Sequence, residues 1–139
     1  MDFLYSFMRI EDFDEIYKLW SSIQGLNLNK ADEKGSVNAY LLRNPNQSYV
    51  CKLSNKIIGT IMCGNDGRRA FIYHLAVLPE YQRKGIATEL VRLAIDMQKQ
   101  LGIDKCAIFI LNENVYGKNF WSNVGFSKVQ EAEIMAKNI

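Results

Sequence analysis

The chain has 139 residues, of which 48% are hydrophobic and 23% charged, and its net charge is +2 at pH 7. This length suits one domain covering residues 1–139, with a core that forms without disulfides or metals. The small net charge and a pI of about 8.4 exclude the strongly basic surface of a typical nucleic-acid-binding protein, so we expect no nucleic-acid partner.

Nothing in the sequence predicts export or membrane insertion. The N-terminus lacks the basic start and cleavage site of a secretory signal, and no run reaches the ~20 apolar residues of a membrane span. The cysteines Cys51, Cys63 and Cys106 each sit in an apolar run, and none belongs to a CxxC pair. We therefore expect three buried, reduced thiols, no metal site, no membrane partner and a cytoplasmic location.

Hydrophobic periodicity predicts the elements of the first half. In chain order they are a strand at 3–10, a helix that ends at Gly25, a short helix that stops before Asn44, and strands at 48–53, 57–63 and 69–77. The run Ser54–Lys56 is predicted to be a tight turn. The run Gly64–Gly67 predicts a hairpin, because Asp-Gly tolerates the positive φ angles of a type I′ turn.

The second half begins with the clearest helix, from Gly85 to Leu101, which has one apolar stripe and ends before a capping Gly102. A buried strand at 105–111 and a helix at 114–124 follow, with Asn114 as the N-cap of that helix. Two closing strands are predicted at 126–129 and 132–136. The order β-α-α-β-β-β-α-β-α-β-β defines an α/β (α+β) domain with a mixed sheet.

The most informative stretch is the loop that leads into the long helix. It combines hydrogen-bond donors, positive charge and small residues: Gln82, Arg83, Lys84, Gly85, Ile86, Ala87 and Thr88. The first amides of a helix have no internal partner, and the helix dipole makes that end attractive to anions. The loop therefore suits a pyrophosphate, whereas Gly85 alone would equally fit a plain strand-to-helix turn.

This loop resembles the (Gln/Arg)-x-x-Gly-x-(Gly/Ala) signature of the GNAT superfamily of acyl-CoA N-acyltransferases. The preceding run, Leu75–Tyr81, is similar to the usual lead-in of that family. A second family segment, near the C-terminus, is matched by Asn114, Phe120, Trp121, Gly125 and Phe126. The hairpin at Gly64–Arg69 resembles that of a small bacterial branch of acetyltransferases, and the resemblance covers nearly the whole chain.

The resemblance implies a mostly antiparallel sheet whose two central parallel strands splay apart to admit the pantetheine arm of acetyl-CoA. Leu75, Ala76 and Val77 would line that arm, and the Val77 N–H would polarise the thioester oxygen. Residues Gln82 to Thr88 would hold the pyrophosphate, and Asn114 would reach the pantetheine amide. Acetyl-CoA is then the co-substrate, with no metal, and a primary amine of unknown identity attacks the acetyl carbon directly.

The sequence leaves open which residues act as the general acid and the general base. Trp121 stands where many relatives have a Tyr that protonates the leaving thiolate, and Tyr116 is the nearest alternative. The positions where some relatives carry a Glu base cannot serve here, so the candidate bases are His74, Tyr73, Asp66 and Glu113, with a water-relayed base or no base as alternatives. His74 is the only histidine, the side chain best suited to act as a base near neutral pH. Strand alternation places Tyr73 on the opposite face of the sheet.

Three function classes are compatible with these observations. The first is an N-acetyltransferase, monomeric or homodimeric, that acts on a peptide N-terminus, a lysine or a small-molecule amine. The second is a non-catalytic acyl-CoA-binding module, indicated by Trp121 and by the missing Glu. The third, another kind of nucleotide-binding domain, is disfavoured because the loop lacks the glycine spacing of dinucleotide folds and the Gly-Lys-Ser/Thr of a P-loop.

Overall fold

The computed structural model describes all 139 residues, which divide into two compact units, Met1–Phe109 and Ile110–Ile139. The first unit is built on a five-stranded sheet in the order β1-β2-β3-β4-β5. Its strands are β1 (Leu4–Phe7), β2 (Tyr49–Leu53), β3 (Lys56–Asn65), β4 (Ala70–Val77) and β5 (Cys106–Ile108). Its helices are α1 (Phe13–Ser22), α2 (Lys34–Arg43) and α3 (Ile86–Gln100), and the second unit contains α4 (Val115–Asn123).

The sheet is mixed and mostly antiparallel, as the sequence predicts. Each pair of neighbours from β1 to β4 is antiparallel, and only β4 and β5 are parallel. The parallel pairing joins Ala70–Ile72 to Cys106–Ile108 and goes no further along β4. The rest of that strand, Tyr73–Val77, therefore has no partner strand on this side, which confirms the predicted parting of the two parallel strands.

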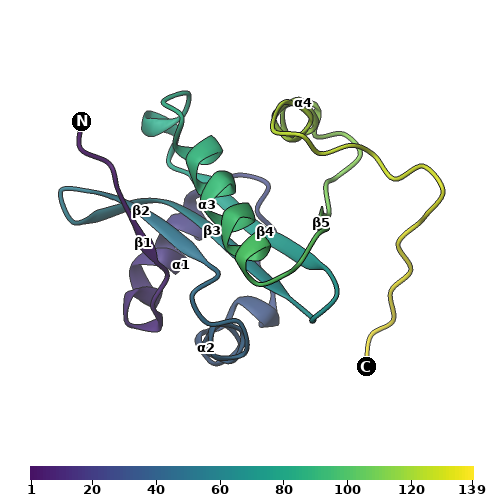
Figure 1. Cartoon of the computed structure of the whole chain (residues 1–139). Helices are drawn as coiled ribbons and strands as arrows, with labels where there is room; N and C mark the ends of the chain where they lie inside the picture. The colour runs from purple at the N-terminus through teal and green to yellow at the C-terminus, as the bar shows by residue number, and fades with distance from the viewer. The chain divides into compact units, whose positions relative to one another are not determined.

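Helices cover both faces of the sheet, with α3 in front of the strands in Figure 1 and α1 behind them. The side chains of β3 alternate between these two layers. Thr60 accepts a hydrogen bond from Trp20 of α1, and Met62 belongs to the core cluster around that helix. A Cβ added at Gly59 would touch Ile86 of α3. Both layers are closely packed, so β3 is the buried centre of the first unit.

A β-bulge interrupts β4 in its middle. Thr60 pairs with Ala76 and Met62 pairs with Tyr73, so the single residue between them on β3 faces two residues on β4, His74 and Leu75. His74 adopts the left-handed region, with a φ of 47°. Such a bulge re-aims the side chains around it. Tyr73 and His74 therefore both contact aromatic rings of the α1 and α2 layer, and the predicted placement on opposite faces is wrong.

Local turn signals place most of the connections correctly. Ser54 and Asn55 both have positive φ angles and form the predicted tight turn between β2 and β3. The hairpin between β3 and β4 forms too, but Gly67 has a positive φ and Asp66 does not, which excludes type I′. The Asp66 carboxylate accepts the amides of Arg68 and Arg69 at 2.8 and 2.9 Å, and this side-chain turn replaces the predicted one.

The C-terminal part departs most from the prediction. The strand expected at 105–111 forms only as the half-buried β5, and the closing strands expected at 126–129 and 132–136 are absent. Val129, Ile134 and Met135 are each more than half exposed. Four charged residues interrupt the apolar alternation of this segment: Lys128, Glu131, Glu133 and Lys137. With too few apolar residues to bury, the segment stays extended without pairing.

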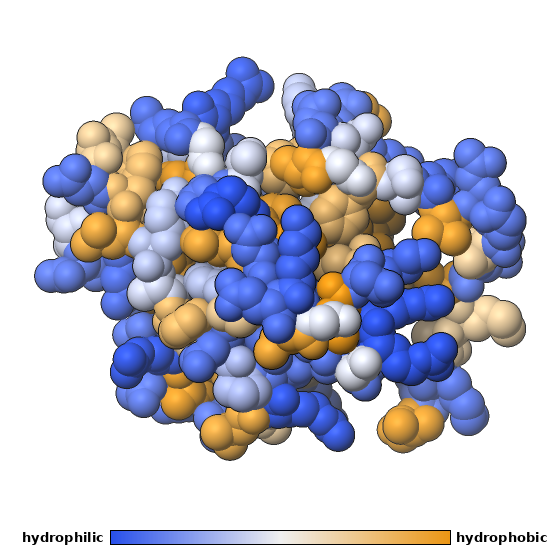
Figure 2. All heavy atoms as spheres, in the orientation of Figure 1, coloured by the Kyte–Doolittle hydropathy of each residue, from blue (hydrophilic) through white to orange (hydrophobic).

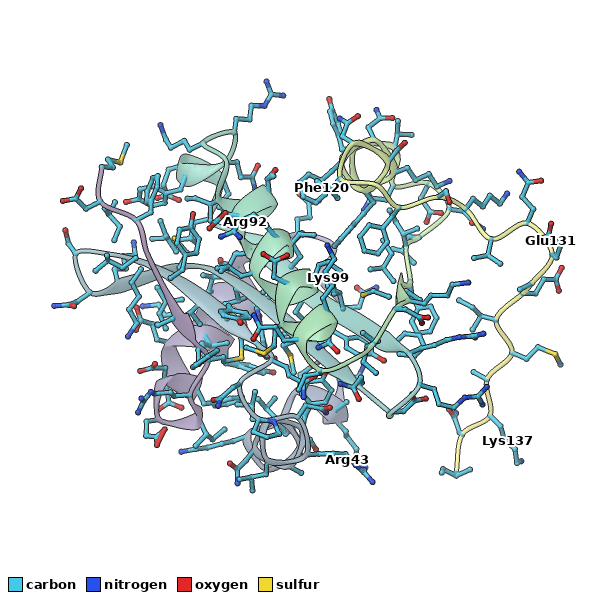
Figure 3. All side chains as sticks on the ribbon, viewed as in Figure 1. Arg43, Arg92, Lys99, Phe120, Glu131 and Lys137 are labelled. Carbon is cyan, nitrogen blue, oxygen red and sulfur yellow. The ribbon has the colours of Figure 1, made fainter.

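Amphipathic α3 has a strongly polar outer face. Arg92 binds Glu89 at 2.7 Å and Asp96 at 2.8 Å there, and this part of the surface is hydrophilic in Figure 2. Figure 3 shows Arg92 and Lys99 on the side of the helix that is turned toward the viewer. None of the helices of the chain is both long and apolar enough to cross a membrane.

Candidate active site

The predicted pyrophosphate loop follows a short 3-10 helix at Pro79–Tyr81 and leads directly into α3. Arg83 and Gly85 both have positive φ angles, 62° and 83°, so the backbone turns sharply here. The side chains of Gln82, Arg83 and Lys84 are exposed. The loop therefore presents its backbone and two cationic side chains to solvent at the N-terminus of the longest helix.

The first amides of α3 are free to bind a ligand. The first helical hydrogen bond runs from the Glu89 N–H to the Gly85 carbonyl at 3.0 Å, and the amides of Gly85–Thr88 have no acceptor in the protein. A Cβ at Gly85 would meet nothing within 4 Å. The turn is thus an open cradle of N–H groups with the positive helix end behind it, which fits a diphosphate.

Two residues of the predicted cofactor site have buried side chains, so only their backbone groups are available to a ligand. Ile86 is 1% exposed and Ala76 is 4% exposed, and both side chains are packed inside the first unit. The side chain of Gln82 also has a partner, because its Nε2 donates to the Val77 carbonyl at 3.0 Å. Gln82 therefore braces the loop against the end of β4 and leaves Arg83 and Lys84 as its exposed cations.

The Val77 N–H points to the unpaired side of β4. The Leu78 N–H donates to Ile58 of β3 at 2.9 Å, and successive amides of a strand point to opposite sides. The Val77 N–H therefore faces away from β3, on the side where β5 pairs only with Ala70–Ile72. The bulge ends at Leu75, so the same alternation says nothing about the direction of that amide.

His74 is held from three directions. Its Nε2 lies 2.6 Å from Oδ1 of Asp32, and its ring packs on Trp20 with a centroid distance of 4.7 Å. The Thr60 hydroxyl donates to the His74 carbonyl at 3.0 Å and accepts the Trp20 indole N–H at 2.9 Å. This arrangement fixes both the imidazole ring and the backbone of the bulge.

The remaining predicted residues lie in the second unit. Asn114 caps α4, as predicted, because its Oδ1 accepts the Gly117 N–H at 2.8 Å. Tyr116 is 84% exposed. Trp121 packs edge-to-face against Phe120 and Phe126, with centroid distances of 5.3 and 4.9 Å. An indole N–H is a very weak acid, so Tyr116 is the one ionisable phenol of this helix.

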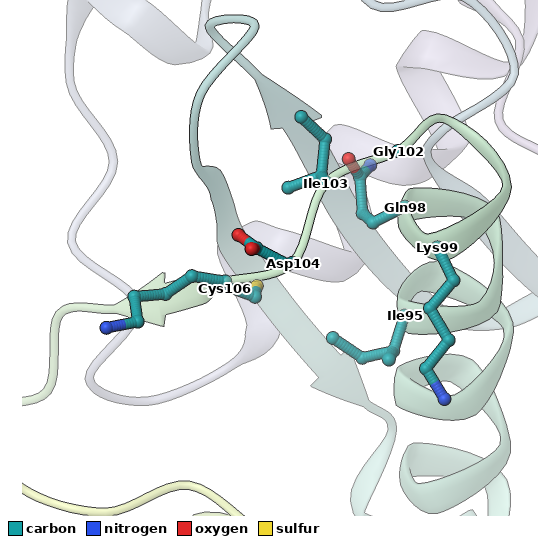
Figure 4. A pocket seen from close by; sticks show the side chains of 8 residues that line it. Ile95, Gln98, Lys99, Gly102, Ile103, Asp104 and Cys106 are labelled. Carbon is teal, nitrogen blue, oxygen red and sulfur yellow. The ribbon is translucent and has the colours of Figure 1, made fainter.

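The cysteines are only partly as predicted. Cys51 and Cys63 are buried, but Cys106 is half-buried. The Cys63 thiol donates a hydrogen bond to Cys106, which raises the pKa of Cys63, with burial adding to the rise. The same hydrogen bond lowers the pKa of Cys106. Cys106 also lines a pocket of about 490 Å³ at the C-terminal end of α3 (Figure 4), opposite to the end that carries the loop.

Sequence reasoning missed two residues of this site, Asp32 and Thr60. Asp32 lies in a 3-10 helix at Lys30–Asp32 and is only 5% exposed. It is 42 residues from His74 in the chain, so no local pattern links the two. The spacing of Asn29 and Asp32 does match a capping box, and that signal could have identified the short helix.

The comparisons with known proteins agree with this fold. Residues 11–126 match the model of the Acetyltransferase (GNAT) family. An acetyltransferase of Photorhabdus laumondii is 31% identical over 109 residues, which are 76% of this chain and 73% of the relative. The PaiA N-acetyltransferase of Thermoplasma acidophilum, in complex with coenzyme A, superimposes with a TM-score of 0.80 at 20% identity, over 96% of this chain and 94% of its own.

A second solved structure is the NatC complex bound to Gag peptide and CoA. One of its chains has a TM-score of 0.78 at 26% identity, over 94% of this chain and 87% of that chain. The present chain belongs to the Acetyltransferase (GNAT) family. The enzyme class and the fold class predicted from the sequence are thereby confirmed, and the chain is an acetyltransferase.

Proposed function

We propose that this acetyltransferase transfers the acetyl group of acetyl-CoA to the nitrogen of a primary amine, in the cytoplasm, as a monomer or a homodimer. The observation that carries the proposal is the set of free amides at Gly85–Thr88, which follow the exposed cations Arg83 and Lys84. The presence of coenzyme A in two solved structures of similar fold supports the identity of the co-substrate.

In this proposal, the loop binds the charged part of acetyl-CoA. The amides of Gly85–Thr88 donate to the pyrophosphate oxygens, and Arg83 and Lys84 neutralise its charge. The unpaired half of β4, with Leu75, Ala76 and Val77, offers backbone groups to the pantetheine arm. Gln82 already occupies the Val77 carbonyl, so Val77 contributes its N–H alone.

The chemical step needs a donor for the charge that develops on the thioester oxygen. The Val77 N–H is aimed at the open side of the strand and can supply that hydrogen bond as a single-donor oxyanion site. The acceptor amine attacks the carbonyl carbon, the C–S bond breaks, and the thiolate of CoA leaves. An ordinary thiol has a pKa of about 8.5, so this leaving group needs little help from an acid.

The acceptor must lose a proton to become nucleophilic, and His74 is the proposed base. The residue lies three positions before Val77 on β4, roughly 10 Å along an extended strand. A bridging water, with two hydrogen bonds of about 2.8 Å each, spans about half of this distance, and proton transfer through one water is an accepted geometry for general base catalysis. Tyr116 or Trp121 as donor to the leaving thiolate, and Asn114 as a contact of the pantetheine amide, stay predictions.

The first test is whether acetyl-CoA stabilises the folded protein through the loop. A ligand present at 100 times its Kd stabilises by about 2.7 kcal/mol, and for 139 residues this raises the Tm by about 9 °C. Gly85→Glu places a carboxylate in the amide cradle and should abolish this increase. Gly102→Glu is the matched control, because Gly102 has a φ of 82° and equally open surroundings at the other end of α3.

Both variants carry the same backbone strain and the same added charge, so their own Tm values should fall by similar amounts. The proposal expects the acetyl-CoA-induced increase to survive in Gly102→Glu and to vanish in Gly85→Glu. An unchanged melting temperature of the wild-type protein at saturating acetyl-CoA, or an equal response of both variants, contradicts it.

A second candidate function rests on Trp121, which cannot transfer a proton as a Tyr would. In that case, the chain binds acyl-CoA and regulates a partner without turnover. A panel of peptide N-termini, lysine, polyamines, amino acids and aminoglycosides, assayed by release of free CoA thiol, separates the two functions. Release with any amine supports the enzyme, and binding without release across the panel supports the module.

A further inference from the structure

Asp32 is buried and contacts the half-buried His74, and the proposed reaction gives Asp32 no role so far. Oδ1 of Asp32 lies 2.6 Å from Nε2 of His74. The second carboxylate oxygen, Oδ2, accepts the Asn29 N–H at 3.0 Å, and Asn29 in turn caps the same short helix. Both oxygens of Asp32 are therefore occupied, and the carboxylate cannot rotate freely.

This contact decides which ring nitrogen of His74 carries the proton. A carboxylate only accepts hydrogen bonds, so Nε2 carries a proton, and in the neutral imidazole Nδ1 then holds the free electron pair. Nδ1 has no partner in the protein. Among the fully buried side-chain nitrogen and oxygen atoms of the chain, only the Tyr40 hydroxyl lacks a hydrogen-bond partner. Because Nδ1 also lacks a partner, it is not one of the fully buried atoms and is open to solvent. The free electron pair is thus reachable by a water molecule.

The bulge holds the ring in place for this purpose. A positive φ at a non-glycine residue is costly and persists only where the surroundings enforce it. Here the Thr60 hydroxyl binds the His74 carbonyl, Trp20 holds Thr60, and the Trp20 ring packs on the imidazole. Backbone strain of this kind clusters at active sites, and here it lies next to a carboxylate that orients the ring, which favours a functional role for His74.

We propose that Asp32 is the positioning residue for His74, keeping Nδ1 unprotonated and oriented as the base of the acetyl transfer. This inference rests on the proposed function. Nδ1 takes a proton from the acceptor ammonium through a bridging water, which leaves a neutral amine. The amine nitrogen then bonds to the acetyl carbon as the C–S bond breaks. Its remaining extra proton passes to solvent or to the thiolate of CoA.

The substitution Asp32→Asn tests the role of the carboxylate with little change of shape. The Asn29 N–H requires an acceptor and would keep the oxygen of the new side-chain amide on its side, so the amide nitrogen would face His74. A donor at that place forces the other tautomer, with Nδ1 protonated and unable to act as a base. We expect kcat to fall by about 10²-fold to 10⁴-fold, the usual contribution of a general base, with the KM for acetyl-CoA unchanged.

The chain has one histidine, so its tautomer can be read directly. Long-range ¹H–¹⁵N correlation spectra of the uniformly ¹⁵N-labelled protein should show Nε2 protonated in the wild type and Nδ1 protonated in Asp32→Asn. Asp96→Asn is the matched control, since it removes an Asp contact with Arg92 on the outer face of α3. This control should retain the wild-type tautomer and the wild-type kcat.

The outcomes separate this inference from the function on which it rests. Absence of acetyl-CoA binding or of turnover in the wild type overturns both. Turnover with an Nδ1-protonated wild-type His74, or a kcat within threefold of wild type in Asp32→Asn after the tautomer has changed, overturns the role of Asp32 alone. The wild-type spectrum alone can overturn the inference, so the test holds even if Asp32→Asn does not fold.

Discussion

Gly59 lets the first turn of α3 approach the sheet, and replacing it should disturb both stability and the binding loop. A Cβ at this position would lie 3.2 Å from Cγ2 of Ile86 and 3.4 Å from Cδ1 of Leu90. Ile86 and Leu90 are at most 1% exposed and have no free space to move into. Gly59→Ala therefore adds a methyl group to a filled layer between β3 and α3.

Two opposing effects set the size of the change. Overpacking a filled core costs about 1–3 kcal/mol. Replacing glycine by alanine at a negative φ recovers about 0.4–1 kcal/mol by restricting the unfolded chain. The net loss is about 0.5–2 kcal/mol, which lowers the Tm of a chain of this length by about 2–7 °C. Ile86 begins α3, so the affinity for acetyl-CoA should fall as well.

Urea unfolding and thermal melting of both forms measure this difference. Gly35→Ala is the matched control, because Gly35 lies exposed in α2 and a Cβ there meets nothing within 4 Å. That variant should gain about 0.5 kcal/mol from helix propensity. Ile86→Leu moves the branch away from the new methyl group, so it should offset part of the loss in the double variant. A Gly59→Ala protein as stable as Gly35→Ala refutes this reasoning.

Two further predictions concern the thiols and α4. The lowered pKa of Cys106 means that a larger fraction of this thiol is thiolate at a given pH. Iodoacetamide should therefore modify Cys106 first, and at a lower pH than an ordinary thiol, while the buried Cys51 and Cys63 are protected. Peptide mapping across pH 6–9 measures the order of labelling, and labelling of Cys63 before Cys106 contradicts the prediction. A Cβ at Gly117 would lie 2.5 Å from the Asn114 side chain, so Gly117→Ala should break the Asn114 cap and destabilise α4 by about 1 kcal/mol. In an Asn114→Ala background, where the cap is already lost, the same substitution should stabilise α4 through its higher helix propensity. Amide hydrogen exchange in α4 measures both effects, and additive effects of the two substitutions would refute the coupling.

Most of the fold could be predicted because its signals are local. The cations of the loop, the stripe of α3, the cap of Asn114 and the glycines after α1, α3 and α4 are all readable within a few residues. The loop proposed to bind the pyrophosphate belongs to this group. Its free amides follow from a helix that begins at Ile86 after a glycine, and no distant contact is needed to form it.

The rest depends on contacts between distant segments. The bulge at His74 arises because Thr60 and Trp20 hold the backbone there, and neither neighbour is close in the sequence. The hydrogen bond between Asp32 and His74 likewise joins residues that are far apart in the sequence. The predicted closing strands failed for a related reason, because a short apolar alternation becomes a strand only when another strand pairs with it.

The extra residue in β4 determines which backbone N–H of the strand can act as the proposed oxyanion donor. Amide direction alternates along a strand, so one inserted position exchanges the two edges for everything beyond it. Without that insertion, Ala76 and Val77 would be turned over relative to the hairpin end of the strand, and a different N–H would face the open side of β4, where we propose that the acetyl group binds. The proposed oxyanion donor is therefore selected by the number of residues in the strand and not by any side chain. Substitutions of the Val77 side chain would leave this N–H in place, whereas deletion of one residue upstream in β4 would bring the N–H of a neighbouring residue to the open side of the strand.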